Sequence, residues 1–237
     1  MRDLTFYLDG VDAADFGIVM QGPIAFEDPV PVIDGDAVNG RNGDLLYYDG
    51  SFENRGASVP CYVLDRNASN QIAAINKFLL SAKGYRRLET SDDPDHFWMA
   101  AVTNGAPLNQ ISGVLNPFEI EFDCKPQRFR VDGEQAVSVL SGDSIENPYG
   151  FPASPIVRIT GAGSGVLNIG SYRVDILVID EHGITLDSDT MNAYNVNGNQ
   201  NNNIKASEFP MLVDGQNTVS YDGGITGVEI VPRWWEL

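Results

Sequence analysis

Histidine is a common general base and metal ligand, and this chain of 237 residues contains only His96 and His182. Neither belongs to a His-Glu-x-x-His pattern, a Cys/His cluster or a nucleophile elbow. The chain also lacks a Gly-x-x-x-x-Gly-Lys-Ser/Thr loop for phosphate. We therefore interpret both histidines as surface residues. The sequence predicts no catalytic residue, no cofactor and no metal site.

Carboxylates are plentiful, so the paired acids of a glycoside hydrolase must be considered. Glu119 and Glu121 are two residues apart and would share one face of a strand. They alternate with Phe118, Ile120 and Phe122, which indicates that the apolar face is buried and the acidic face is solvated. We therefore interpret this pair as surface charge rather than as a catalytic dyad.

Two further acidic segments are better explained as turns. Asp92, Asp93 and Pro94 predict a turn between strands rather than a metal site. The segment that begins Asp34-Gly-Asp36 resembles a calcium loop at first, but its fifth and sixth positions are Val and Asn, where an oxygen ligand and a glycine are required. The calcium interpretation is therefore rejected.

Glycines follow this segment closely. Gly40, Gly43 and Gly50, together with Arg41, are interpreted as structural turn residues, because glycine adopts positive φ at little cost. They are not expected to bind a ligand.

Two tryptophans near the end of the sequence offer the other chemistry that must be weighed. Trp234 and Trp235 could stack on a sugar ring, as aromatic side chains do in lectin-like β-sandwiches, with Tyr194 or Tyr221 as helpers. The simpler interpretation is a final strand that buries a tryptophan in the core. A carbohydrate-binding adhesin that recognises a cell-wall saccharide is therefore kept as the alternative function.

Charge and cysteine content restrict the partners. The chain has 33 acidic and 15 basic residues, a net charge of −18, whereas binding to phosphate backbones or anionic lipid relies on Lys and Arg. No apolar run approaches the roughly 18 residues of a membrane span, and the start lacks the apolar core of a signal peptide. We expect a soluble protein of a reducing cytoplasm, with Cys61 and Cys124 as buried free thiols.

The elements that must position these residues are mainly strands. Apolar and polar residues alternate with period two in most segments, which is typical of half-buried antiparallel strands. Ile72, Ile75, Leu79 and Ala82 instead have helical spacing, with Asn67 or Ser69 as a cap and Gly84 as the stop. A hairpin at about 85–101 should follow this single helix.

The composition shifts after residue 130. Residues 131–153 contain several Gly and Pro and few strand signals, which predicts a connector between an N-terminal domain, 1–130, and a C-terminal β-sandwich, 154–237. The Asn-rich stretch 195–203 is expected to be a long polar loop.

The order of the motifs resembles the distal tail protein family, the Dit family, of phages with long, non-contractile tails. The resemblance spans nearly the whole chain. It is carried by Asp15-Phe-Gly17, Gly40-Arg-Asn-Gly-Asp44, Asp49-Gly-Ser-Phe52, the single helix, the 91–95 turn, Phe118-Glu-Ile-Glu-Phe-Asp-Cys124, Ser154-Pro-Ile-Val, Gly161-Ala-Gly-Ser-Gly165, Leu186-Asp-Ser-Asp189, Phe209-Pro-Met-Leu, Gly215-Gln-Asn-Thr218 and Glu229-Ile-Val-Pro-Arg-Trp234.

The resemblance implies a mainly β virion protein at the tail tip, assembled in the host cytoplasm. An N-terminal belt domain would form a homohexameric ring, and the C-terminal domain would be a sandwich like those of galectins or carbohydrate-binding modules. The ring would join the tail-tube protein to the tail-associated spike protein and to receptor-binding or baseplate proteins, without catalysis. DNA would pass through its lumen without specific binding.

A closed ring needs one repeated contact between different surfaces of neighbouring copies. We expect the hairpin at about 85–101 and the terminal strands to provide that contact. The Asn-rich stretch is expected to project outward and to contact a peripheral baseplate or receptor-binding protein.

Overall fold

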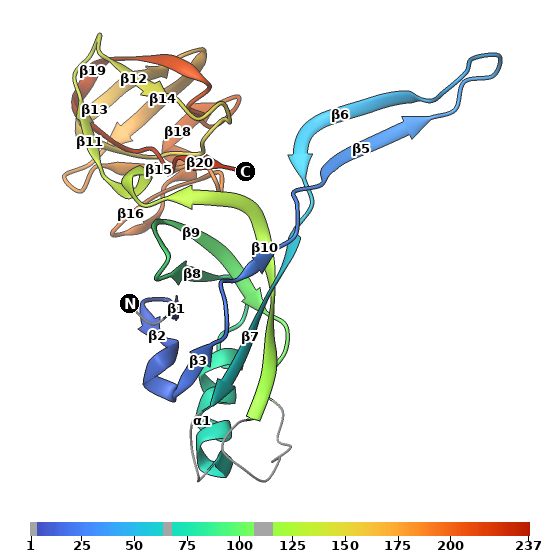
Figure 1. Cartoon of the computed structure of the whole chain (residues 1–237). Helices are drawn as coiled ribbons and strands as arrows, with labels where there is room; N and C mark the ends of the chain where they lie inside the picture. Colours follow the sequence, from blue (N-terminus) through green and yellow to red (C-terminus); the bar gives the residue numbers. More distant parts are fainter. Residues whose placement is uncertain (1–3, 64–67, 107–115) are drawn as a thin grey trace. The chain divides into compact units, whose positions relative to one another are not determined.

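The structure is a computed structural model that describes residues 4–63, 68–106 and 116–237. Two compact units are distinguished by their internal contacts: unit 1, Met1–Arg128 with Leu237, and unit 2, Phe129–Glu236. Strands dominate both units, and the described part of the chain contains one α-helix (Figure 1). The predicted mainly β fold with a single helix is therefore confirmed.

Unit 1 is built on an antiparallel sheet in the order β2-β1-β8-β9-β10-β7-β3, with β4 added beside β7. The bounds of its strands are β1 (Phe6–Leu8), β2 (Val11–Asp12), β3 (Ile18–Met20), β4 (Ala25–Phe26), β7 (Arg55–Val63), β8 (Arg86–Thr90), β9 (Asp93–Val102) and β10 (Asn116–Arg130). A short 3-10 helix, η1 (Ala13–Phe16), joins β2 to β3. Because side chains alternate across a strand, Ile120 and Phe122 are buried while Glu119 and Glu121 are exposed, as predicted.

The helix α1 (Ala68–Leu80) contributes one face to the core of unit 1. Ile75 and Leu79 lie in that core, as their spacing predicted. The helix ends two residues before Ala82, which is exposed, and Gly84 has a φ of +87° in the following loop rather than at the helix end. Asn67, one of the two predicted caps, lies outside the described residues.

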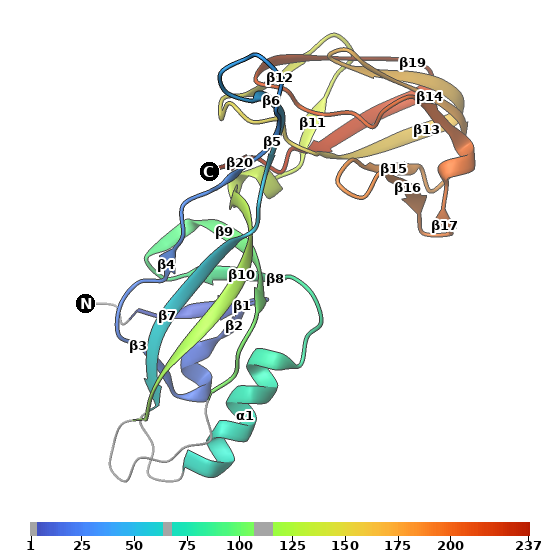
Figure 2. The ribbon, with the colours of Figure 1, turned by 90° about the vertical axis from the view of Figure 1, so that its right-hand side faces the viewer.

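Unit 2 contains the second large sheet, with the order β11-β19-β13-β15-β16-β17 and β14 and β12 on β13 and β19 (Figure 2). Its elements are η2 (Asp132–Glu134), β11 (Val137–Val139), β12 (Ser144–Asn147), β13 (Ile156–Ile169), β14 (Tyr172–Ile179), β15 (Ile184–Asp187), β16 (Asn192–Asn195), β17 (Gly198–Asn199), η3 (Asn201–Asn203), β18 (Ile204–Ala206), β19 (Gly215–Val231) and β20 (Trp235–Glu236). The long strands β13 and β19 pair along most of their lengths.

Glycines allow β13 and β19 to bend together. The register between the two strands shifts at Gly161 and again before Gly165. A Cβ on Gly161 would lie 2.0 Å from the Gly224 carbonyl oxygen, and one on Gly224 would lie 1.8 Å from the Ala162 carbonyl oxygen. Only glycine fits such a close approach of two backbones. The two halves of β13, on either side of the bend, pair with different strands, β15 and β14. The long pair of β13 and β19 therefore belongs to both parts of the sandwich-like unit.

Two predicted loops of the second half are instead strands. The segment 131–153 contains β11 and β12, and both pair with β19, so it belongs to the sheet of unit 2 rather than forming a separate connector. The stretch 195–203 is not one long loop: it contains the last residue of β16, a tight turn, β17 and η3. Its turn is held by side-chain amides: Asn195 donates to Asp180 and to the Gly183 carbonyl.

Candidate functional site

Among the described elements of unit 1, a hairpin at residues 31–52, which we call the arm, is almost wholly exposed to solvent. Its strands, β5 (Pro31–Asp36) and β6 (Leu45–Phe52), pair with each other in a two-stranded sheet of their own. Nearly every residue of both strands is exposed to solvent. Isolated two-stranded hairpins are at best marginally stable in water, so this element is a candidate for contact with another chain.

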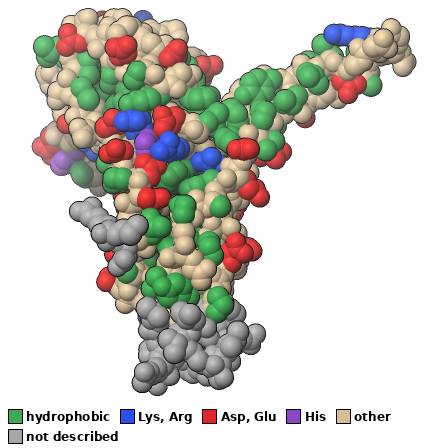
Figure 3. Space-filling view, viewed as in Figure 1, with side chains coloured by type: hydrophobic (Ala, Val, Ile, Leu, Met, Phe, Trp, Pro, Cys, Tyr) green, Lys and Arg blue, Asp and Glu red, His purple; other side chains and the backbone are tan. Residues whose placement is uncertain are grey.

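The register of the arm separates its side chains into two faces. Ile33 pairs with Tyr48, and Gly35 pairs with Leu46. Because directly opposed residues share a face, Ile33, Leu46 and Tyr48 form one apolar face, with exposures of 51%, 65% and 56%. Figure 3 shows apolar side chains gathered along the arm.

The opposite face of the arm is acidic as well as apolar. Asp34 pairs with Tyr47, and Asp36 pairs with Leu45. Two carboxylates therefore flank a tyrosine and a leucine on this face, and all four residues are exposed. The two faces offer different chemistry to a partner.

The predicted turn residues Gly40, Arg41, Gly43 and Gly50 all lie in the arm. Gly40, Arg41 and Gly43 are in the loop between β5 and β6, where the Arg41 N–H donates to the Val38 carbonyl at 3.1 Å. Gly50 lies within β6, at an irregularity in the register. The three glycines have φ of +80°, +80° and +85°, and no atom lies within 4 Å of an added Cβ at any of them. Their side of the backbone is open.

The other predicted turn group links β8 to β9. Asp92 lies in the turn, and Asp93 and Pro94 begin β9. The Asp93 carboxylate lies 2.7 Å from His96 Nδ1 and accepts a hydrogen bond from Arg128 at 2.6 Å. Burial raises the pKa of Asp93, but hydrogen bonds from His96 and Arg128 outweigh this and lower it below its usual value.

This contact corrects the prediction that both histidines lie on the surface. His182 is exposed, but His96 is 8% exposed and is held by Asp93. The spacing Asp-x-x-His was visible in the sequence, but a strand that begins at Asp93 was needed to place both side chains together. The pair sits against an arginine and has no nucleophile beside it in the described residues, so it is a structural contact.

The expected ring contact at 85–101 stays a prediction, but these strands offer no free edge for it. β8 pairs with β1 and β9, and β9 pairs with β8 and β10, so both are interior strands. Interior strands have no free edge for another chain. The exposed hairpin of unit 1 is the arm instead.

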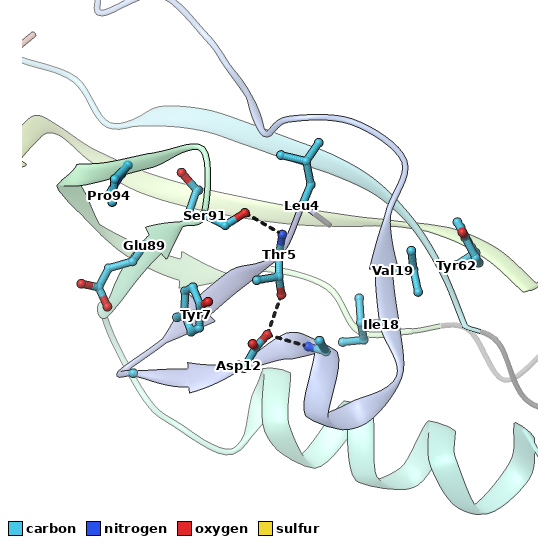
Figure 4. Close-up of a pocket in the computed structure, with 13 residues that line it drawn as sticks. Leu4, Thr5, Tyr7, Asp12, Ile18, Val19, Tyr62, Glu89, Ser91 and Pro94 are labelled. Carbon is cyan, nitrogen blue, oxygen red and sulfur yellow. Dashed lines mark hydrogen bonds between the residues drawn. The ribbon is translucent and has the colours of Figure 1, made fainter. Parts of the chain in front are cut away.

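A shallow hollow of about 940 Å³ opens on unit 1 beside β1 and β3 (Figure 4). Its polar groups satisfy one another. Thr5 Oγ1 donates to Asp12 at 2.5 Å, and the Thr5 N–H donates to Ser91 Oγ at 3.0 Å. Leu4, Ile18 and Tyr62 are among the other residues that line it.

The two tryptophans proposed for sugar stacking lie in unit 2. Trp234 is 8% exposed and belongs to the core. Trp235 stacks on Phe151 with ring centroids 4.6 Å apart and donates from Nε1 to the Pro152 carbonyl at 3.0 Å. One ring is thus enclosed and the other already has an aromatic partner, so neither presents a free, ready stacking platform. Saccharide binding stays a prediction without support from this geometry.

Cys61 and Cys124 are free, buried thiols, as predicted. Burial raises the pKa of each to about 12. Across residues 4–63, 68–106 and 116–237 no group of His, Cys, Asp and Glu is suited to hold a metal ion. No described helix is long and apolar enough to cross a membrane.

The fold was compared with known proteins. No protein-family model and no curated protein sequence matches the chain. Among solved structures it is similar to SPP1 Dit, described as a paradigm of the hub adsorption apparatus in phages that infect Gram-positive bacteria. That match has a TM-score of 0.70 at 15% identity and covers 97% of this chain and 98% of the other.

A chain of the phage P2 baseplate in its activated conformation with Ca is also similar, with a TM-score of 0.55 at 10% identity and 97% of both chains covered. Both likenesses cover nearly the whole of this chain. The resemblance inferred from the sequence is therefore confirmed at the level of the fold: the chain has the fold of the SPP1 Dit hub protein.

Proposed function

We propose that this chain is a hub protein at the distal end of a long, non-contractile phage tail. Six copies would form a ring that joins the tail-tube protein to the tail-associated spike and to receptor-binding or baseplate proteins. The observation that carries the proposal is the likeness to SPP1 Dit over 97% of the chain, both units included. The role is structural, at the tail tip of the virion.

The arm supports an assembly of copies. Its apolar face, Ile33, Leu46 and Tyr48, leaves more than half of each side chain in water. Burial of apolar area against a neighbour would stabilise the contact by roughly 25 cal/mol per Å². A ring needs the same contact repeated between unlike surfaces, and an element that projects from each copy can supply it.

The acidic composition agrees with a conduit for DNA. Six copies carry six times the net charge of −18. A negative wall repels phosphates within a Debye length, about 10 Å at 0.1 M salt, so DNA would pass without being trapped. Acidic side chains should then line the lumen, and a neutral or basic lumen in a structure of the ring would contradict this part of the proposal.

The mass of the purified chain in solution tests the assembly. Light scattering should give six times 25.8 kDa for the chain alone, or that mass plus the mass of the bound tube protein when the tube protein of the same phage is added. A variant in which residues 31–52 are replaced by Gly-Asn should be monomeric and keep its circular dichroism spectrum, because β4 and β7 already pair beneath the arm. A matched control is Met191→Ser with Val196→Ser, which removes exposed apolar side chains of unit 2 and should leave the ring intact.

A full-length chain that is monomeric in both conditions would overturn the ring. An arm-deleted chain that still forms hexamers would leave the ring in place and exclude the arm as its contact.

A further inference from the structure

Unit 1 contains a second hollow, of about 340 Å³, which we call the Arg55 hollow. Its lining includes Ile24, Phe26, Arg55, Asp93, Trp98 and Arg128. Arg55 is at the start of β7 and Phe26 is in β4, which pairs with β7, so the strand pairing places both at the hollow. The Phe26 ring stacks on Trp98 at 4.4 Å between centroids, and the Arg55 guanidinium lies 5.1 Å from the centre of the Phe26 ring.

Two hydrogen-bond donors of this hollow lack acceptors. Arg55 is 7% exposed and Trp98 is 4% exposed. Within the described residues, neither Arg55 Nε nor Trp98 Nε1 has a hydrogen-bond partner. An unsatisfied buried donor costs free energy, and here two of them line one hollow. Both require an acceptor, and Arg55 also requires a negative charge.

A second buried arginine of unit 1 shows what a satisfied site looks like. Arg86 is 9% exposed and donates to the Asp9 carboxylate and to the carbonyls of Phe78 and Leu8. All three of its nitrogens are used. In the described part of the chain no ion pair includes Arg55.

The nearby side-chain carboxylates do not form an ion pair with Arg55. Asp93 lines the hollow, but its two oxygens are engaged by His96 and Arg128. Asp28 is exposed and acts on Arg55 only through space, and Asp92 is an exposed turn residue on the rim. Burial lowers the pKa of Arg55, and the charge of Arg128 lowers it further, against the opposing effects of Cys124 and Asp28. The Arg55 side chain is buried and, within the described residues, forms no ion pair with a side-chain carboxylate; Leu237, the last residue of this chain, also lines the hollow.

We propose that the Arg55 hollow binds a carboxylate presented by another polypeptide chain, with Arg55 as the charged donor and Trp98 as the second donor. The ligand is an acceptor because both orphan groups donate, and it is anionic because one of them is a buried cation. The chain itself is rich in such groups, and the arm presents Asp34 and Asp36 on one exposed face. A second copy, as in the proposed ring, is therefore one source, and an acidic segment of another protein is the other.

Fluorescence anisotropy with two short peptides tests the site. The probes are Gly-Asp-Gly-Asp-Gly and Gly-Asn-Gly-Asn-Gly, blocked at both ends and carrying the same uncharged dye. The full-length protein should bind the Asp peptide saturably and the Asn peptide at least about tenfold more weakly. Arg55→Met should remove this preference and keep the thermal stability, because an unpaired buried cation is replaced by an apolar side chain of similar length. Trp98→Phe should weaken binding of the Asp peptide by about threefold.

Arg158→Met is the matched control. It removes one positive charge from an exposed pair with Glu229 in unit 2, so a general charge effect would appear in both variants. Equal binding of the two peptides, or equal losses in Arg55→Met and Arg158→Met, would overturn the proposal. Tighter binding of inorganic phosphate than of the Asp peptide would overturn the assignment to a carboxylate.

Light scattering of the variants identifies the source of the carboxylate. If a second copy supplies it, Arg55→Met and the double change Asp34→Asn, Asp36→Asn should weaken self-association equally, and their combination should weaken it no further. Self-association that is unchanged in Arg55→Met, with the peptide preference lost, would assign the carboxylate to another protein. A chain that binds the Asp peptide but never self-associates would refute the ring and support the Arg55 hollow as a binding site. A chain that forms the ring but does not bind the peptide would support the ring and refute the site.

Discussion

The arm of unit 1 and the bend of β13 and β19 in unit 2 are both antiparallel strand pairs interrupted by glycines, yet the glycines act differently. In the arm, Gly40 and Gly43 have positive φ and an added Cβ would meet nothing within 4 Å. In the bend, a Cβ on Gly161 or Gly224 would lie within 2.0 Å of a carbonyl oxygen of the facing strand.

This difference shows which surfaces of each strand pair remain accessible. The bend is closed against added side chains, because its two backbones approach so closely that a Cβ on Gly161 or Gly224 would collide with the facing strand. The arm is open on both faces, so its side chains are available to another chain. The same residue type therefore marks an internal constraint in one unit and a freely accessible surface in the other.

Gly224→Val should have the largest effect and would break the bend. The new Cβ would start 1.8 Å from the Ala162 carbonyl oxygen, so the two strands must separate. We expect a loss of about 4 kcal/mol in the free energy of unfolding, or no folded unit 2. Urea unfolding followed by circular dichroism measures it. A variant that keeps its unfolding midpoint would show that the bend can accommodate a side chain. The proposed difference between the glycines of the bend and those of the arm would then be wrong.

Asp93→Asn should have the next largest effect, and it separates the body of unit 1 from the arm. The folded pKa of Asp93 lies below its ordinary value of 3.8, because hydrogen bonds from His96 and Arg128 outweigh burial. The carboxylate therefore adds stability above the unfolded pKa, and this is lost as the pH falls through the folded pKa. The variant should lose about 2 kcal/mol at neutral pH and show a flatter acid limb below about pH 4.

The control is Asp49→Asn in the arm, whose carboxylate accepts hydrogen bonds from the N–H and the hydroxyl of Ser51 in the same strand. It should leave the stability of unit 1 unchanged at neutral pH. An acid limb that is identical in wild type and Asp93→Asn would assign the acid sensitivity to other carboxylates.

Gly43→Ala should have a smaller effect, about 1 kcal/mol, confined to the arm. The φ of +80° disfavours alanine, but no atom crowds its Cβ. Amide hydrogen exchange should quicken in β5 and β6 and stay unchanged in β7. Gly224→Ala, the same chemical change in the bend, should slow or prevent folding of unit 2; similar mild effects at both positions would remove the contrast.

The sequence predicted what depends on periodicity. The alternation of Phe118, Ile120 and Phe122 identified a half-buried strand, and Ile75 and Leu79 identified the buried face of the helix. These patterns arise where one face meets a core and the other meets water. The order of the motifs added the family resemblance, which the fold likeness supports.

The sequence did not predict features that depend on distant partners. β11 and β12 are short, and their partner β19 lies about eighty residues along the chain, so they resembled a connector. The run Leu45-Leu-Tyr-Tyr48 has no period because neither face of the arm is buried in its own unit. The orphan donors Arg55 and Trp98 come from β7 and β9, and only the folded sheet brings them to one hollow.

The smallest expected effect on stability is the one that tests the arm most directly. Leu46→Ser with Tyr48→Ser removes most of one apolar face, and both side chains are more than half exposed. Since little of either is buried in the free chain, the free energy of unfolding should change by less than about 0.5 kcal/mol. Self-association should nevertheless weaken by at least about tenfold if this face is buried against a neighbour, because two large apolar side chains are lost from the contact.

Leu45→Ser with Tyr47→Ser is the control, since it makes the same chemical change on the face that carries Asp34 and Asp36. If only the Leu46 and Tyr48 variant dissociates, the arm binds the neighbouring copy through its apolar face. If only the Leu45 and Tyr47 variant dissociates, the acidic face is the one in contact. If both variants assemble like the wild type, the arm is exposed in the assembly as well, and its surface is not used for the contact between copies.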